Sequence, residues 1–236
     1  MRQTLVIAVA LAGAVAGAQT PPPAPRPPDT PFRDESLRYS INWPSGLSLG
    51  EAQMQASGTG ERWSFAFSLD AAVPGFAVSD SYQAVAAGDF CSVELLKEAT
   101  HGRRKTSERT KFEAQEGRAT RESTGGGGKS ELSVPACSRD GLTFFYYLRR
   151  ELSQGRLPGP QTVYFGAPYQ VRLEYGGPQA IRVNDRPMDA ERVTVSYKGP
   201  ASQGAFELYL SRDAARTPVM VRVPLAVGAF SMELVR

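Results

Sequence analysis

Apolar and polar residues alternate with a period of two through most of this 236-residue sequence. Leu37–Trp43 shows the pattern, and Trp63–Leu69 repeats it. Successive side chains of a β-strand point to opposite faces, so each run is apolar on one face and polar on the other. This pattern is typical of an antiparallel sheet with one covered face. Further runs of the same kind occupy Tyr169–Tyr175, Val193–Tyr197, Phe206–Leu210, Val219–Leu225 and Phe230–Leu234.

Turn-forming residues separate these runs, and together they predict about a dozen strands. One segment departs from the alternation. Between Arg139 and Ser153 the apolar residues have the spacing of a helix, with Ser138 or Asp140 available as the N-cap and Gly155 just after the end. We therefore expect a mainly β domain with one helix that covers part of its apolar face.

The first eighteen residues have the features of a secretory signal peptide. Arg2 is their only charge, Leu5–Val15 is apolar, and Ala16-Gly17-Ala18 offers a cleavage site. A membrane anchor is the alternative, but it needs about 20 apolar residues, and this run is shorter. Residues 19–35 are rich in proline and indicate either an extended tether or an unstructured leader. We expect residues 36–236 to form a single β-rich domain, with no transmembrane segment after signal cleavage.

Cys91 and Cys137 are the only two cysteines. An even count in an exported protein predicts a disulfide between them. A redox enzyme would need a Cys-x-x-Cys pair, and a structural zinc site would need more ligands than two cysteines and the single histidine supply. We therefore expect a structural disulfide in a protein that is periplasmic or secreted.

The formal net charge is +3, far from the strongly basic balance of most nucleic-acid-binding proteins, so we expect no nucleic-acid partner. Charges of both signs crowd the segment Lys97–Glu131, which contains nine Lys or Arg and six Glu residues. Mixed signs indicate solvated strands, with a docking surface for anionic lipid or polysaccharide as the alternative.

Three further features resemble parts of known catalytic or phosphate-binding sites, but each lacks residues that such a site requires. Ser123–Ser130 ends like a phosphate-binding loop, yet Ser123 stands where the first glycine belongs and a short strand follows, which favours a hairpin loop. His101 is interpreted as an exposed turn residue, because its neighbours Gly102 and Arg103 are typical of a turn in the charged segment. The sequence has no Gly-x-Ser-x-Gly elbow that would favour a catalytic triad. Strand spacing selects no catalytic pair among the candidate carboxylates, which are Glu94, Glu174, Asp185, Asp189 and Glu207. We predict no catalytic residue, metal ligand or cofactor.

Several segments, taken in order, resemble a family of exported bacterial proteins known as domain of unknown function 3108. The resemblance is carried by Leu37–Trp43, Leu49–Ala52, Ser79–Tyr82, Asp140–Arg149 and, most specifically, Leu208–Pro218, and it extends over nearly all of residues 36–236. Arg212 departs from the pattern, because the family commonly has an acidic residue there. The resemblance implies an exported protein with a strongly curved β-sheet, and it implies no activity and no site residues.

We therefore expect a large curved antiparallel sheet, shaped like a half-barrel or a clam, with one packed helix. A helix of about fifteen residues is roughly 22 Å long, whereas a dozen strands extend over more than about 50 Å. An apolar cleft should remain beside the helix, lined by Phe145, Leu148 and inward-facing strand aromatics. The aromatic run Phe144–Tyr147 serves either this cleft or the core.

The resulting functional hypothesis is a non-catalytic binding module for an amphiphilic small molecule or an envelope component. It rests on analogy with curved-sheet carriers, and analogy of fold is a weak guide to function. A carboxylate-dependent hydrolase and a protein-interaction or assembly domain of the envelope are the alternatives.

The exported form is expected to begin at Gln19, because signal peptidase cleaves after small residues such as those at positions 16 and 18. N-terminal sequencing or peptide mapping of the protein recovered outside the cytoplasm measures this directly. An exported protein that retains Met1 would contradict the predicted signal peptide.

Overall fold

The computed structural model describes residue 32 and residues 34–59, 61–73, 76–124, 127–225 and 228–235. The predicted signal peptide, residues 1–18, lies outside the described residues. The predicted linker, residues 19–35, also lies outside them apart from Phe32, Asp34 and Glu35.

The described residues form one sheet of fifteen strands, which confirms the mainly β fold with somewhat more strands than expected. The N-terminal half contains eight strands in sequence order: β1 (Glu35–Asn42), β2 (Ser48–Gly58), β3 (Arg62–Val73), β4 (Phe76–Ala87), β5 (Ser92–His101), β6 (Arg104–Glu113), β7 (Arg118–Ser123) and β8 (Gly128–Ser133). The C-terminal half contains seven: β9 (Arg139–Asp140), β10 (Gln161–Tyr164), β11 (Pro168–Val183), β12 (Arg186–Lys198), β13 (Gln203–Ser211), β14 (Pro218–Leu225) and β15 (Gly228–Val235). A short 3₁₀ turn, η1 (Ala114–Glu116), connects β6 to β7.

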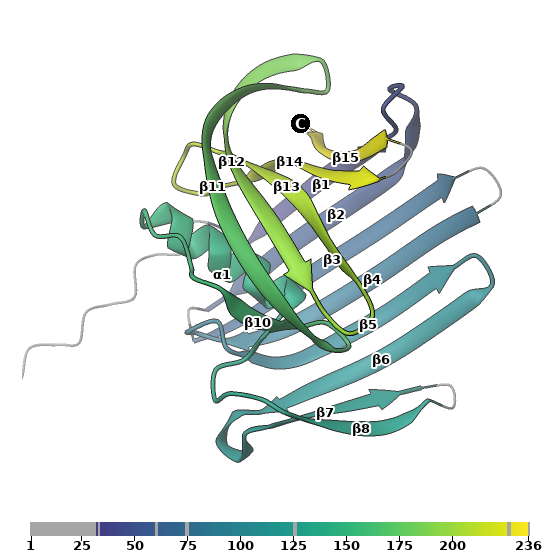
Figure 1. Cartoon of the computed structure of the whole chain (residues 1–236), viewed down its shortest axis with the longest axis vertical. Coiled ribbons are helices and arrows are strands. Elements are labelled where there is room, and N and C mark those ends of the chain that lie inside the picture. Colours follow the sequence, from purple (N-terminus) through teal and green to yellow (C-terminus); the bar gives the residue numbers. More distant parts are fainter. Residues whose placement is uncertain are drawn as a thin grey trace, which may run out of the picture.

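The two halves join where β1 pairs with β15, so the first and last strands lie side by side at the centre of the sheet. Neighbouring strands are antiparallel, except that β9 and β10 run parallel. The outer strands β8 and β9 do not pair with each other, which leaves the sheet unclosed. In Figure 1 the two halves curve around the helix, the N-terminal half in purple to teal and the C-terminal half in green to yellow.

The predicted helix is confirmed as α1 (Gly141–Ser153). It begins after Asp140, whose side chain is the N-cap and accepts hydrogen bonds from two backbone N–H groups of the first turn. Gly155 follows the end with a φ of +72°, a backbone conformation that glycine adopts without steric strain. Among the described residues, no helix has both the length and the apolar composition that a membrane crossing requires.

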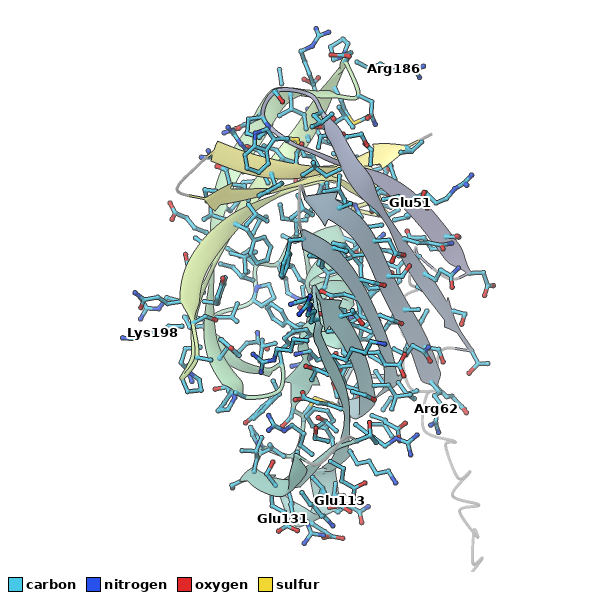
Figure 2. All side chains as sticks on the ribbon, turned by 90° about the vertical axis from the view of Figure 1, so that its right-hand side faces the viewer. Glu51, Arg62, Glu113, Glu131, Arg186 and Lys198 are labelled. Atoms are coloured by element: carbon cyan, nitrogen blue, oxygen red, sulfur yellow. A yellow bond between two sulfur atoms is a disulfide. The ribbon has the colours of Figure 1, made fainter. Side chains whose placement is uncertain are left out.

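Helix α1 packs against both halves of the sheet through different faces. Tyr146 contacts the N-terminal half, where its ring stacks on Phe65 with the centroids 4.1 Å apart. Phe144, Leu148 and Leu152 pack against the apolar face of the C-terminal half. The helix is therefore the core element that the two halves share, and Figure 2 shows side chains of both halves projecting into the space between them.

Phe32 lies within the proline-rich segment yet is only 1% exposed. Its ring packs against those of Trp63, Phe90 and Tyr146, with centroid separations of 5.7, 6.0 and 5.3 Å. The proline content predicts an extended segment, but it does not predict that one apolar side chain of the segment is buried in the core. The hydrophobic core therefore includes a residue that precedes the first strand.

The buried side chain of Arg149 connects α1 to two distant segments of the chain. Its guanidinium donates to both carboxylate oxygens of Glu35 at 2.7 Å. It also donates to the backbone carbonyls of Ala215 and Arg216, in the loop between β13 and β14. The Asp213 carboxylate accepts hydrogen bonds from the backbone N–H groups of those two residues and so holds the loop in shape. Each nitrogen of the buried guanidinium therefore donates to an oxygen atom. These hydrogen bonds offset the free-energy cost of removing the charge from water.

Phe65→Asp should lower the free energy of unfolding by more than about 3 kcal/mol, because it removes a buried ring and places a charge on the apolar face. Phe65 is 1% exposed, whereas its neighbour Ser64 is exposed on the opposite face of β3. Ser64→Asp, the matched control, should change it by no more than about 0.5 kcal/mol. Urea denaturation measures both values. If both substitutions change the free energy of unfolding equally, the assignment of Phe65 to the buried face of β3 and of Ser64 to the exposed face is wrong.

Candidate ligand-binding pocket

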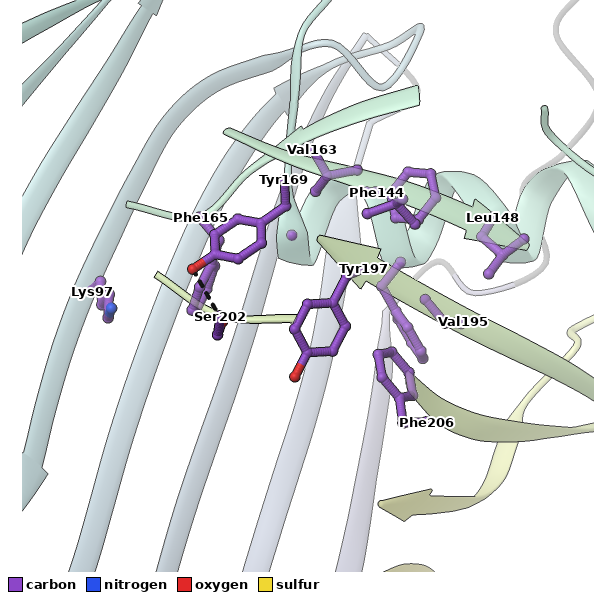
Figure 3. Close-up of a pocket in the computed structure, with 13 residues that line it drawn as sticks. Lys97, Phe144, Leu148, Val163, Phe165, Tyr169, Val195, Tyr197, Ser202 and Phe206 are labelled. Atoms are coloured by element: carbon purple, nitrogen blue, oxygen red, sulfur yellow. Dashed lines mark hydrogen bonds between the residues drawn. The ribbon is translucent and has the colours of Figure 1, made fainter. Parts of the chain in front are cut away.

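An apolar pocket of about 490 Å3 lies between helix α1 and the inner face of the C-terminal half of the sheet. Its volume falls within the range of about 300–1,000 Å3 that is usual for small-molecule sites. Figure 3 shows the residues that line it, which come from the helix, from β10–β13 and from the facing strand β5. The pocket is thus built by segments from both halves of the sheet.

Helix α1 supplies Phe144, Phe145 and Leu148 to the wall of the pocket. Residues three and four apart lie on the same face of a helix, so these three side chains reach the pocket together. Tyr146 points away from them, into the core of the N-terminal half. Phe145 and Leu148 are the two cleft residues that the sequence predicted, and both lie in this wall. Their role in ligand binding stays a prediction.

Inward-facing residues of four strands form the opposite wall: Val163 of β10, Val171 of β11, Val195 of β12 and Phe206 of β13. Val195 and Phe206 are directly paired across β12 and β13, so they lie on the same face of the sheet. The period-two alternation of the sequence therefore determines which strand residues can reach the pocket.

Hydroxyl groups from Tyr169, Tyr197 and Ser202 also border the pocket. The Ser202 hydroxyl donates to the Tyr169 hydroxyl at 3.5 Å, and the two tyrosine rings meet nearly edge to face, with centroids 6.1 Å apart. Both rings lie close to glycine backbone. A Cβ atom on Gly199 would lie 2.3 Å from the Tyr169 ring, and one on Gly204 would lie 2.7 Å from the Tyr197 hydroxyl. The two glycines therefore leave room for the tyrosines.

The N-terminal half contributes Lys97 of β5, which was not singled out from the sequence as a pocket residue. Its amino group lies 4.8 Å from the ring centroid of Phe165, a residue of the loop between β10 and β11. Lys97 is the only charged residue among the described residues that line the pocket. The pocket is therefore an apolar space with hydroxyl groups and a single cation.

The other sequence candidates lie outside this pocket. His101 Nε2 is 2.8 Å from an Asp80 carboxylate oxygen, and the histidine side chain is about half exposed at the end of β5. Ser123 and Gly128 pair across β7 and β8, so the glycine-rich segment connects a hairpin, as predicted. Glu207 is paired with arginine side chains on its own half of the sheet. None of the candidate carboxylates is among the described residues that line the pocket.

A disulfide between Cys91 and Cys137 joins the start of β5 to the segment that leads into α1, with the Cα atoms 4.8 Å apart. Beside it, the Ser92 hydroxyl donates to the buried Asp140 carboxylate at 2.6 Å. Burial raises the pKa of Asp140, while hydrogen bonds from Ser92 and Thr143 act in the opposite direction. These two links hold the start of the helix, and with it one wall of the pocket, against the N-terminal half.

Together these features define a class of protein in which a curved, unclosed antiparallel sheet wraps one helix and leaves an apolar pocket beside it. A solved structure from Brucella abortus, titled a beta-barrel-like protein of domain of unknown function DUF1849, has the same fold. It aligns with a TM-score of 0.59 and 10% identity, over 87% of this chain and 97% of that one. A "putative lipoprotein" from Parabacteroides distasonis aligns with a TM-score of 0.34 and 8% identity, over 86% and 94% of the two chains.

The protein belongs to the family described as Protein of unknown function (DUF3108), whose sequence model matches residues 38–235. This confirms the family resemblance found in the sequence. A comparison with functionally curated proteins finds no significant match.

Replacing both cysteines, Cys91→Ser with Cys137→Ser, should lower the free energy of unfolding by up to about 4 kcal/mol, the chain-entropy value for a loop of this size. The two cysteines are 46 residues apart. Thermal unfolding measures the loss, and circular dichroism should remain β-rich. Wild-type protein under reducing conditions serves as the control and should unfold like the variant. If oxidised and reduced wild type unfold at the same temperature, the disulfide contributes nothing to stability.

Proposed function

We propose that this protein is an exported, non-catalytic binding module that holds an apolar or amphiphilic molecule in the pocket beside α1. One observation carries the proposal: the pocket of about 490 Å3 is walled by apolar side chains of the helix and of four strands. The burial of apolar surface is the main favourable contribution to the binding free energy of such a ligand. Because the pocket is already formed, none of this free energy is used to open it.

Export is the second part of the proposal. The disulfide between Cys91 and Cys137 supports it, because disulfides persist in oxidising compartments and are rare in the cytosol. The signal-peptide pattern of residues 1–18 supports it independently. A binding module outside the cytoplasm would meet envelope lipids and other amphiphiles directly.

A hydrolase is less well supported by the same geometry. The carboxylate-dependent hydrolysis considered from the sequence requires a pair of carboxylates within reach of the substrate, and a Ser-His-acid triad requires a histidine. The pocket's described lining residues include neither. His101 and Asp80 do pair with each other, but they do so at the end of β5, outside the lining.

A neutral, environment-sensitive apolar dye should bind the folded protein at micromolar concentration and gain fluorescence. Leu148→Trp should weaken this binding at least about tenfold, because the larger ring fills the space between the helix and β12. Leu157→Trp is the matched control: it makes the same substitution at a leucine that is 39% exposed and outside the pocket lining. Fluorescence titration measures all three proteins.

Circular dichroism and thermal unfolding show whether each variant is folded. If Leu148→Trp does not fold, Val195→Phe fills the same pocket from the opposite wall. The proposal fails if the folded wild type does not bind the dye, or if the pocket variants bind it as well as Leu157→Trp does.

A further inference from the structure

We propose that the ligand is a single-chain amphiphile with an anionic head, a carboxylate or a phosphate, and that Lys97 pairs with this head. The inference rests on the proposed function, since it assigns the ligand class of the same pocket. Three observations support it: the side of the sheet on which Lys97 lies, the separation of polar from apolar groups in the pocket, and the pocket's volume.

Lys97 lies on the inner face of the sheet, and it is the only charged residue among the described residues that line the pocket. In β5 it alternates with Leu95 and Ala99, which are 2% and 8% exposed, so all three side chains start from the same face. Phe165 is the aromatic partner of its amino group. No ion pair within 4.0 Å joins Lys97 to a carboxylate of the described residues. A partly buried cation without an ion-pair partner is stabilised when a bound anion supplies that partner.

Two acidic residues of the neighbouring strands, Asp80 and Glu108, lie on the same face as Lys97. The Asp80 carboxylate accepts a hydrogen bond from the Tyr82 hydroxyl and lies 2.8 Å from the His101 ring. Glu108 of β6 is the register partner of Lys97. Its carboxylate lies instead beside Gly166, where a Cβ atom would be 3.4 Å from its Oε2 atom and 3.7 Å from Arg121. Arg121 also donates to the Gly166 carbonyl. Among the described residues, the Glu108 carboxylate forms no ion pair within 4.0 Å with Lys97, which leaves the Lys97 amino group for a ligand.

Polar and apolar groups occupy different parts of the pocket. Figure 3 shows Lys97 and the hydrogen-bonded pair Tyr169 and Ser202 on one side of the view, and Leu148 with Phe206 on the other. The hydroxyl groups on the same side of the view as the lysine can donate hydrogen bonds to an anionic head. The apolar part, bordered by the helix, suits a hydrocarbon tail. This arrangement matches a molecule with one charged end and one apolar end.

The pocket volume suits a ligand with one tail. A pocket of about 490 Å3 has the size of ordinary small-molecule sites and accommodates the tail of one acyl chain. A fatty acid or a single-chain phosphate ester fits this description.

Displacement of the neutral dye by dodecyl compounds that differ only in the head tests the assignment. Dodecanoate and dodecyl phosphate should displace the dye at concentrations at least about tenfold lower than dodecanol does, and dodecyltrimethylammonium should be the weakest. Lys97→Met should remove the preference for anions and leave the displacement of the dye by dodecanol unchanged. Lys97→Arg should retain the preference for anions. Lys111→Met is the control, because Lys111 is an exposed lysine on the neighbouring strand. All titrations stay below the micelle concentration.

The outcomes separate the two proposals. If the neutral dye and dodecanol bind but Lys97→Met keeps the full preference for anions, the head-group assignment is wrong and the proposed function stands. If neither the dye nor any dodecyl compound binds the folded wild type, the proposed function itself fails. Displacement by dodecanoate alone, or by dodecyl phosphate alone, identifies which anionic head the site accepts. A preference for the cationic compound would overturn the assignment outright.

Discussion

The buried guanidinium of Arg149 holds together three parts of the chain that no local interaction would join. Its carboxylate partner, Glu35, begins the first strand, 114 residues away, and its carbonyl partner Ala215 lies 66 residues further along the chain. The Arg149 side chain is fully buried, so removing one partner would leave an uncompensated charge, a loss that typically costs about 3–5 kcal/mol. Helix α1 therefore cannot shift along the sheet without breaking this contact. The wall that the helix gives to the pocket depends on that constraint.

The segment that most clearly marks the family, Leu208–Pro218, has a structural role that follows from the same contact. Ser211 and Asp213 hold the loop through their side chains, the first accepting from the Thr217 backbone N–H and the second from two further backbone groups. The loop presents its carbonyls to Arg149. A distinctive sequence motif in this protein thus builds the fold, and the pocket residues come from other segments.

The apolar helix residues of the pocket could be predicted from the sequence, whereas its cation, Lys97, could not. Phe145 and Leu148 were predictable, because helical spacing shows that they share a face and one short helix cannot cover so wide a sheet. Lys97 stands in a run of mixed charge, where a solvated lysine is the ordinary interpretation. The available signal was its position in phase with Leu95 and Ala99 on the buried face of β5. Its aromatic partner Phe165 comes from a distant loop, which no local pattern connects to β5.

The sequence by itself determined most of the strands, the helix with either Ser138 or Asp140 as its cap, and the facing of residues such as Phe65, because period and capping depend on neighbouring residues alone. The tertiary structure decided the pairing of β1 with β15, the open edges at β8 and β9, and the presence of one cation in an apolar pocket. Those features depend on which distant surfaces meet. Two interactions bring these surfaces together: the contacts of Arg149 and the packing of one helix between the two halves of the sheet. Both act between residues that are far apart in the sequence.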